Sequence, residues 1–138
     1  MSEARFTSRR RMEFADTDLG GIVHFSRFFV FMETAEHEFL RSLGTEVHFD
    51  LDGLKIGWPR VGARCTYSKP ARFADVLDIE MRILRRGTRS MTYGFRFLRD
   101  GEVLAEGELS SVCCVLNDPE GLRAIAIPKA LADQLQGG

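Results

Sequence analysis

Several features that would assign this sequence of 138 residues to a specialised class of protein are missing from it. No stretch approaches the roughly 20 apolar residues of a membrane-spanning helix, and the N-terminal segment has no apolar core of signal-peptide length. The three cysteines, two of them adjacent, do not resemble a disulfide framework. A net charge of −1 gives no basic field for nucleic acid. We therefore expect a cytoplasmic protein with no membrane span and no nucleic-acid partner.

Metal-binding patterns are missing as well. No Cys-x-x-Cys or His/Cys cluster indicates zinc. Asp16, Asp18 and Gly20 begin like a calcium loop, but a third acidic ligand is missing and Arg27 stands where the closing Glu belongs. No phosphate-loop lysine follows the glycine pair. We expect neither a metal nor a cofactor.

The composition is that of an ordinary globular protein, with 44% hydrophobic and 28% charged residues. The length fits a single domain, residues 1–138, that buries roughly two-thirds of its unfolded surface and needs no disulfide or metal for stability. No internal repeat, low-complexity segment or linker divides the chain. We therefore look for function in one compact unit.

The clearest helix is expected between Ser26, a plausible N-cap, and Gly44, placed where a C-terminal glycine belongs. Apolar residues recur there at intervals of four, three, four and four, as Phe28, Met32, Ala35, Phe39 and Leu43. Polar residues fall on the other faces, namely Glu36, His37, Glu38 and Arg41. Further apolar residues widen the stripe, namely Phe29, Phe31 and Leu40. Such a helix is expected to be wrapped by a sheet.

Alternation with period two predicts strands at residues 5–14, 61–67, 77–83, 91–97 and 103–116. Short turns separate the later strands, which favours an antiparallel meander. A loop is expected at residues 45–58, and a short helix is expected to start at Pro128. One apolar helix must then lie on the apolar face of a curved sheet, which defines an α+β fold.

The segment before the long helix carries the chemistry. Asp16 and Asp18 precede Gly20-Gly21 and the helix start. A helix N-terminus offers unpaired N–H groups and a partial positive charge, which can hold an oxyanion. A carboxylate beside it can attack a carbonyl carbon or activate water. The simpler reading is a turn with capping carboxylates.

Two motifs together resemble the 4-hydroxybenzoyl-CoA thioesterase family. They read Phe-Ala-Asp-Thr-Asp-x-Gly-Gly-Ile-Val from residue 14, and Tyr-x-x-Pro-Ala-x-Phe-x-Asp-x-Leu from residue 67. The resemblance extends from about Arg5 to Pro128. It implies the hotdog fold, an antiparallel five-stranded sheet wrapped around one long central helix. It also implies hydrolysis of an acyl-CoA thioester to free acid and CoA.

The same resemblance suggests roles for individual residues. Asp18 would be the catalytic carboxylate, either as nucleophile or as general base, and the backbone N–H of Phe25 would hold the oxyanion. The side chain of Phe25 need only pack, and Asp16 would fix the turn. His24 either assists proton transfer or lines the pocket. Glu33 is the reserve carboxylate, because a sister branch of thioesterases uses one from this helix.

A cluster of arginines marks the hairpin near residue 87. Arg85, Arg86 and Arg89, with Ser90, either form a solvated turn or hold CoA phosphates, since guanidinium groups match phosphate geometry. The family binds CoA phosphates near this hairpin. Weaker candidates for the same role are Lys69 and Arg72. The long strand at residues 103–116 is expected at a sheet edge, which with the resemblance predicts a homodimer or homotetramer.

Two other functions stay open at this point. Hotdog hydratases act on enoyl-CoA with an Asp and a His a few residues apart, and Asp18 and His24 are six apart. A non-catalytic acyl-CoA-binding module is the other alternative. The acyl group is not identified, because helix aromatics are more often core than pocket. Aromatic, short-chain and medium-chain groups all fit the sequence.

Overall fold

The structure is a computed structural model that describes residues 4–136, so the expected domain of residues 1–138 extends beyond the described part at both ends. It is an α+β fold. Along the chain the elements are β1 (Phe6–Arg11), the 3-10 helix η1 (Phe14–Asp16), α1 (Arg27–Ser42), β2 (Phe49–Leu51), β3 (Leu54–Gly57), β4 (Arg60–Tyr67), β5 (Val76–Arg86), β6 (Ser90–Arg99), β7 (Glu102–Val112), β8 (Cys114–Val115), β9 (Arg123–Ala124) and α2 (Lys129–Gln134).

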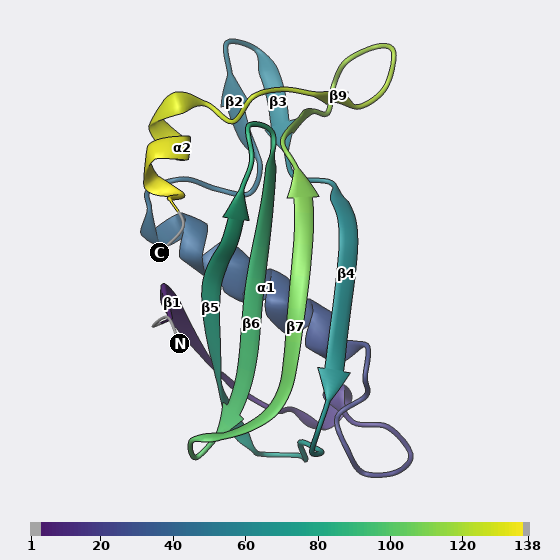
Figure 1. Ribbon diagram of the computed structural model, residues 1–138. Coiled ribbons are helices and arrows are strands. Elements are labelled where there is room, and N and C mark those ends of the chain that lie inside the picture. The colour runs from purple at the N-terminus through teal and green to yellow at the C-terminus, as the bar shows by residue number, and fades with distance from the viewer. Residues whose placement is uncertain (1–3, 137–138) are drawn as a thin grey trace.

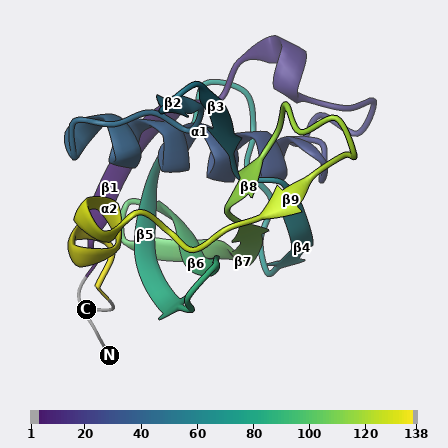
Figure 2. The ribbon, with the colours of Figure 1, turned by 90° about the horizontal axis from the view of Figure 1, so that it is seen from above.

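The larger sheet has five strands in the order β1-β5-β6-β7-β4, and every pair in it is antiparallel. Helix α1 lies across one face of this sheet (Figures 1 and 2). The antiparallel sheet packed on a helix confirms the predicted α+β class. Two details of the predicted meander are wrong. Strand β4 lies beside β7 instead of β5, and β7 is an inner strand, so the sheet edges are β1 and β4.

A second sheet lies at one end of the molecule, in the order β2-β3-β8-β9. It includes the hairpin of β2 and β3, where only a loop was expected. Strands of two to four residues are too short to show an alternating pattern. The predicted fold of one sheet around one long helix is therefore too simple. The described residues form two sheets, an α1 of 16 residues, and a short α2 that follows Pro128 as predicted.

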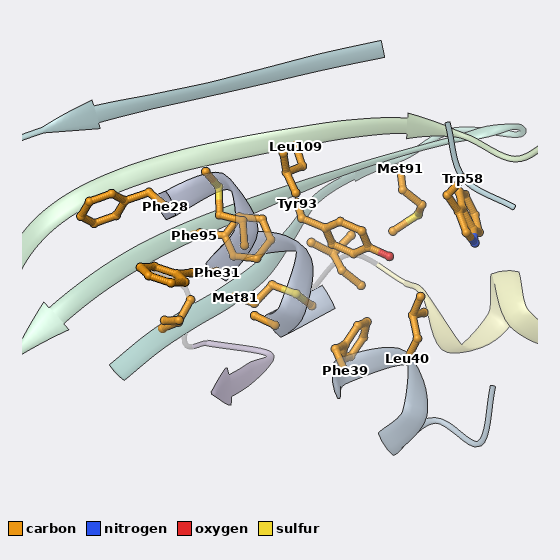
Figure 3. Packing of buried hydrophobic residues seen from close by; sticks show 14 of the residues in the cluster. Phe28, Phe31, Phe39, Leu40, Trp58, Met81, Met91, Tyr93, Phe95 and Leu109 are labelled. Atoms are coloured by element: carbon orange, nitrogen blue, oxygen red, sulfur yellow. The ribbon is translucent and has the colours of Figure 1, made fainter. Parts of the chain in front are cut away.

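The main hydrophobic core lies between α1 and the inner face of the larger sheet (Figure 3). Phe28, Met32, Ala35 and Phe39 are all buried, which confirms the predicted stripe. The helix comes very close to β7 at Gly107, where an added Cβ would lie 2.6 Å from the Met32 sulfur. This close approach explains why a strand facing the core has a glycine there.

Trp58 and two of the three cysteines are also buried. The Trp58 indole is buried, and within the described part of the chain its Nε1–H meets no acceptor. All three cysteines are free. Cys113 and Cys114 are buried, whereas Cys65 on edge strand β4 is only partly buried. The strand-like apolar runs around the cysteines had predicted burial for all three, and for Cys65 this is wrong. Burial raises the pKa of the Cys113 thiol to about 11, which suits an unreactive packing residue.

Between residues 4 and 136, neither helix has the length and apolar character needed to span a lipid bilayer.

Candidate active site

Asp16 ties the loop before α1 to the start of that helix. Its side chain is buried, and its Oδ2 accepts a hydrogen bond from the Glu13 N–H at 2.8 Å. Its Oδ1 accepts another from Arg27 Nε, also at 2.8 Å. The Asp16 carbonyl accepts the His24 N–H at 2.8 Å. Both carboxylate oxygens are therefore engaged in structural contacts, which is the geometry of a residue that fixes the turn.

Asp18 lies on the exposed side of the same loop. Its Oδ1 accepts the Gly20 N–H at 2.8 Å, and its carbonyl accepts the Gly21 N–H at 3.0 Å. Gly21 has a φ of +79°, a conformation that favours glycine. The other oxygen, Oδ2, has no protein partner within the described residues. Asp18 thus forms the simple turn that the spacing suggested and still presents a free carboxylate oxygen to solvent.

The amides at the helix start are not all occupied. The His24 N–H donates to Asp16, and the Ser26 N–H donates to His24 Nδ1 at 3.2 Å. Among residues 4–136, no acceptor is recorded for the Phe25 N–H between them. The Phe25 ring is also 62% exposed, although its side chain was expected to pack. The structure therefore leaves one backbone donor open at the position where the resemblance implied an oxyanion site.

The Ser26 side chain does not take the capping role that was expected of it. Ser26 is the residue before α1, but its backbone is already helical and its hydroxyl caps no helix amide. The Ser26 hydroxyl lies 2.8 Å from His24 Nδ1 instead. Because His24 Nδ1 also accepts the Ser26 N–H, the neutral ring carries its proton on Nε2. The ring stacks on Phe25 at 4.6 Å between centroids.

Two hollows meet at Asp18 and Phe25, which line both. One, of about 980 Å³, also has His24, Gly20 and the exposed Leu19 in its wall. The other, of about 490 Å³, is mostly apolar and is lined further by Ile22, Val23, Phe28, Tyr67, Ser68, Lys69, Pro70 and Ala71. A reactive group placed between Asp18 and the Phe25 N–H would have space on both sides.

The segment between β4 and β5, residues 68–75, forms one wall of the apolar hollow. The Val23 N–H donates to the Ala71 carbonyl at 2.7 Å and so joins this segment to the loop before α1. Asp75 Oδ2 accepts the Arg72 N–H and Arg99 Nη1, both at 2.8 Å. Burial alone would raise the pKa of Asp75, but these two donors outweigh it and hold that pKa below its ordinary value. The second sequence motif therefore shapes the wall of the hollow.

Glu33 and Glu36 meet an arginine that the sequence did not reveal. Glu36 was placed on an outer face of the helix, yet its side chain is 1% exposed and accepts from Arg60 Nη1 at 2.8 Å. Arg60 also binds Glu33 at 3.2 Å and the buried Ser111 hydroxyl at 2.7 Å. Burial lowers the pKa of Arg60, but Glu36 outweighs this and raises it overall. Glu33 thus lines a different hollow from Asp18.

The arginine hairpin lies far from Asp18 in the same chain. Arg85, Arg86 and Arg89 are exposed at the turn between β5 and β6, with Ser90 beginning β6. Figure 1 shows this turn at the upper end of the larger sheet and the loop before α1 at the lower end. The 11 residues of β5 separate the two ends, a length of roughly 35 Å. One chain therefore does not bring these side chains together.

Two other basic residues lie nearer to Asp18. Lys69 lines the apolar hollow but is engaged by Glu102. The backbone of Arg72 pairs with Ile22, and its side chain is exposed. Between residues 4 and 136 there is no group of three or more His, Cys, Asp or Glu side chains arranged to hold a metal ion. The groups around the two hollows that could take part in a reaction are therefore a carboxylate, a backbone amide and a histidine.

Comparison with known proteins finds relatives along nearly the whole chain. Residues 12–135 match a family described as the thioesterase-like superfamily. The acyl-CoA thioester hydrolase YbgC of Escherichia coli O6:H1 is 28% identical over 91% of this chain and 92% of its own length. A solved structure of the BH1999 gentisyl-coenzyme A thioesterase is 29% identical, covers 94% of this chain and 99% of that one, and gives a TM-score of 0.82. The hypothetical protein TT1821 from Thermus thermophilus is 30% identical over 95% and 97% of the two chains, with a TM-score of 0.84.

Proposed function

The chain belongs to the thioesterase-like superfamily and is a thioester hydrolase, and on this basis we propose that it cleaves acyl-CoA at a site formed by Asp18 and the Phe25 N–H. The products would be the free acid and CoA. The observation that carries the proposal is that the free oxygen of Asp18 and the free amide of Phe25 border the same two hollows. The proposal needs no cofactor, since CoA is part of the substrate.

The thioester carbonyl oxygen would accept the Phe25 N–H at the start of α1. The positive end of the helix dipole favours the negative charge that develops on this oxygen. Asp18 then brings about attack on the carbonyl carbon in one of two ways. As a nucleophile it forms a mixed anhydride and expels CoA thiolate, and water later cleaves the anhydride. As a general base it takes a proton from the attacking water.

His24 and Glu33 have secondary places in this proposal. The His24 ring holds its Nε2–H free while its Nδ1 accepts at the helix start, so it can donate a hydrogen bond into the hollow that it shares with Asp18. Glu33 is engaged by Arg60 and faces a different hollow. This supports Asp18 over Glu33 as the working carboxylate.

We place the CoA phosphates on the arginine hairpin of a second copy of the chain. The hairpin and the Asp18 loop of one chain lie roughly 35 Å apart, so they do not contact the same acyl-CoA molecule. Edge strand β4 offers unpaired backbone groups to a second copy, and Val61 on it is 67% exposed. A homodimer, or a homotetramer built from such dimers, would then be the active form.

A thiol-release assay over a panel of acyl-CoA substrates tests the proposal. The panel should include 4-hydroxybenzoyl, benzoyl, short-chain and medium-chain thioesters, because the sequence fits each and one relative is named for an aromatic acyl group. Release of free thiol from at least one of them is expected. Loss of enoyl absorbance without thiol release would indicate a hydratase. Saturable CoA binding with no turnover across the panel would indicate a binding module.

A further inference from the structure

One side-chain contact connects the edge of the larger sheet to the open amide at the helix start. Tyr67, the last residue of β4, donates its hydroxyl hydrogen to the Phe25 carbonyl at 2.8 Å. The two residues are 42 positions apart in the chain. Tyr67 ends β4, Phe25 lies in the turn before α1, and both line the apolar hollow. Tyr67 is the first residue of the second sequence motif, but the motif alone does not indicate its contact with Phe25.

The Tyr67 ring is held in the direction that this hydrogen bond requires. It meets Phe28 edge to face, with centroids 5.2 Å apart and planes at 76°. Phe28 is buried and meets Phe97 of β6 in the same way, at 5.0 Å and 80°. Burial, together with the nearby Cys65, raises the pKa of Tyr67 to about 12. The phenol therefore keeps its proton and remains a donor throughout the neutral range.

Phe25 lies in a turn that the helix start also restrains, since the His24 carbonyl accepts the Arg27 N–H at 2.9 Å. Among residues 4–136 the Phe25 amide meets no acceptor, and its exposed ring stacks on His24. The Tyr67 hydroxyl is thus the one side chain in the described residues that holds the Phe25 backbone by a hydrogen bond. The Phe25 N–H belongs to the peptide before Phe25 and the carbonyl to the peptide after it, so holding the carbonyl limits the φ and ψ rotation that relates the two. A fixed donor needs no reorganisation during reaction, which is the main advantage of an oxyanion site.

We infer that Tyr67 is a positioning residue: by holding the Phe25 carbonyl it limits rotation of Phe25 and helps to keep the Phe25 N–H directed at the thioester carbonyl oxygen. This inference rests on the proposed function. Tyr67 would act through Phe25 and not on the substrate carbonyl itself. Its loss should weaken the donor that stabilises the transition state while leaving ground-state binding of CoA nearly unchanged.

The test is Tyr67→Phe, which removes only the hydroxyl and keeps the ring against Phe28. On a substrate that the wild type hydrolyses, kcat should fall about tenfold, less than the 10²–10³ that follows loss of an oxyanion donor itself. KM should stay within about twofold. Inhibition by an S-alkyl-CoA thioether, which lacks the thioester carbonyl oxygen, should not change. Tyr93→Phe removes a hydroxyl from a buried core tyrosine and serves as the matched control with wild-type kcat.

A second variant, Tyr67→Leu, separates the hydroxyl from the ring. If the hydrogen bond matters, the Phe and Leu variants lose kcat to a similar extent. Wild-type kcat in Tyr67→Phe, with loss only in Tyr67→Leu, would show that the ring acts by packing and would overturn the inference. A loss in Tyr67→Phe that appears equally in KM and in thioether inhibition would overturn it as well. If the wild type releases no thiol from any acyl-CoA, the proposed function fails, and this inference fails with it.

Discussion

Asp18 and Asp16 are two residues apart but differ in what their carboxylates touch. Asp16 is buried with both oxygens bound, whereas Asp18 is exposed with one oxygen free. Asp18→Asn keeps the acceptor for the Gly20 N–H and removes the negative charge. We expect kcat to fall by roughly 10²–10⁴, with a much smaller change in KM, in steady-state thiol-release kinetics.

The matched control for that experiment is Asp16→Asn. Because Asp16 pairs with Arg27 in a buried position, its replacement should mainly lower the free energy of unfolding, by about 1–3 kcal/mol. Thermal melts of both variants separate the two effects. A folded Asp18→Asn protein with near-normal turnover would make Asp18 a turn residue, and Glu33→Gln would be the next variant to measure.

At the scale of elements, residues 68–75 depend on one ion pair. Asp75 is held by Arg99 and by the Arg72 N–H, and its pKa lies below the ordinary value. A lowered pKa contributes stability above about pH 4 that is lost as the pH falls through the folded-state pKa. Asp75→Asn should therefore lower stability at pH 7 by about 1 kcal/mol, since the pair is partly exposed.

The pH dependence of this loss of stability distinguishes the effect of the ion pair from an effect of altered packing. Urea unfolding of wild type and Asp75→Asn should give curves that differ at pH 7 and converge below about pH 3. A difference that is equally large at both pH values would mean that the charge on Asp75 contributes nothing. The hollow beside Asp18 should also change shape in the variant, because Ala71 and Val23 are joined across this segment.

Helix α1 and strand β4 are joined by Arg60. Arg60→Ala leaves the Glu36 carboxylate, 1% exposed, without its partner, so we expect a loss of about 3 kcal/mol or more in unfolding free energy. Arg64→Ala on the same strand removes an exposed ion pair with Glu108 and should cost under about 1 kcal/mol. Chemical denaturation measures both. If the two variants unfold alike, Glu36 is solvated and the Arg60 pair does not hold the helix.

At the scale of the whole molecule, the exposed β4 edge predicts self-association. Val61→Lys places a charge on the exposed edge and should shift light-scattering mass toward the monomer at micromolar concentration. Leu122→Lys is the matched control, because Leu122 is 62% exposed but lies outside β4. A wild-type protein that is a clean monomer with full activity would contradict both the dimer and the shared site.

The arginine hairpin gives a second test at this scale. Arg86→Ala with Arg89→Ala should raise KM for acyl-CoA and leave hydrolysis of a short thioester without the nucleotide unchanged. The reason is that only the CoA phosphates would reach these side chains. Equal losses on both substrates would point to a folding defect. Mixing this double variant with the Asp18→Asn variant should restore part of the activity. In a mixed dimer, one copy would supply the arginines and the other would supply Asp18.

How far the sequence predicts this molecule depends on the range of each interaction. The α1 stripe and the turn near Gly87 were predicted because their signals are local. Glu36 was misplaced because its partner, Arg60, is 24 residues away and no helical pattern shows it. The place of β4 beside β7 was missed for a similar reason, since alternation says which residues form a strand but not which strand lies next to it.

The candidate site divides in the same way. Asp18 and the helix start could be found from a motif of adjacent residues, and their assigned roles remain predictions. The Tyr67 contact with Phe25 could not, because it depends on how the sheet edge meets the loop. The distance between Asp18 and Arg86 likewise follows only from the direction of β5. Local chemistry was accessible from the residues, whereas its spatial relations needed the fold.

The position of Trp58 gives the protein an internal optical reporter. It is the only tryptophan in the sequence, and its indole is buried beside Met91, at the end of the core away from Phe28 (Figure 3). Phe28 lines the hollow next to Asp18, so emission from Trp58 reports on the end of the core opposite to this hollow. In a denaturant titration, turnover and fluorescence therefore monitor two separate regions. If the catalytic loop opens on its own, turnover will be lost at a lower denaturant concentration than the one that shifts the emission.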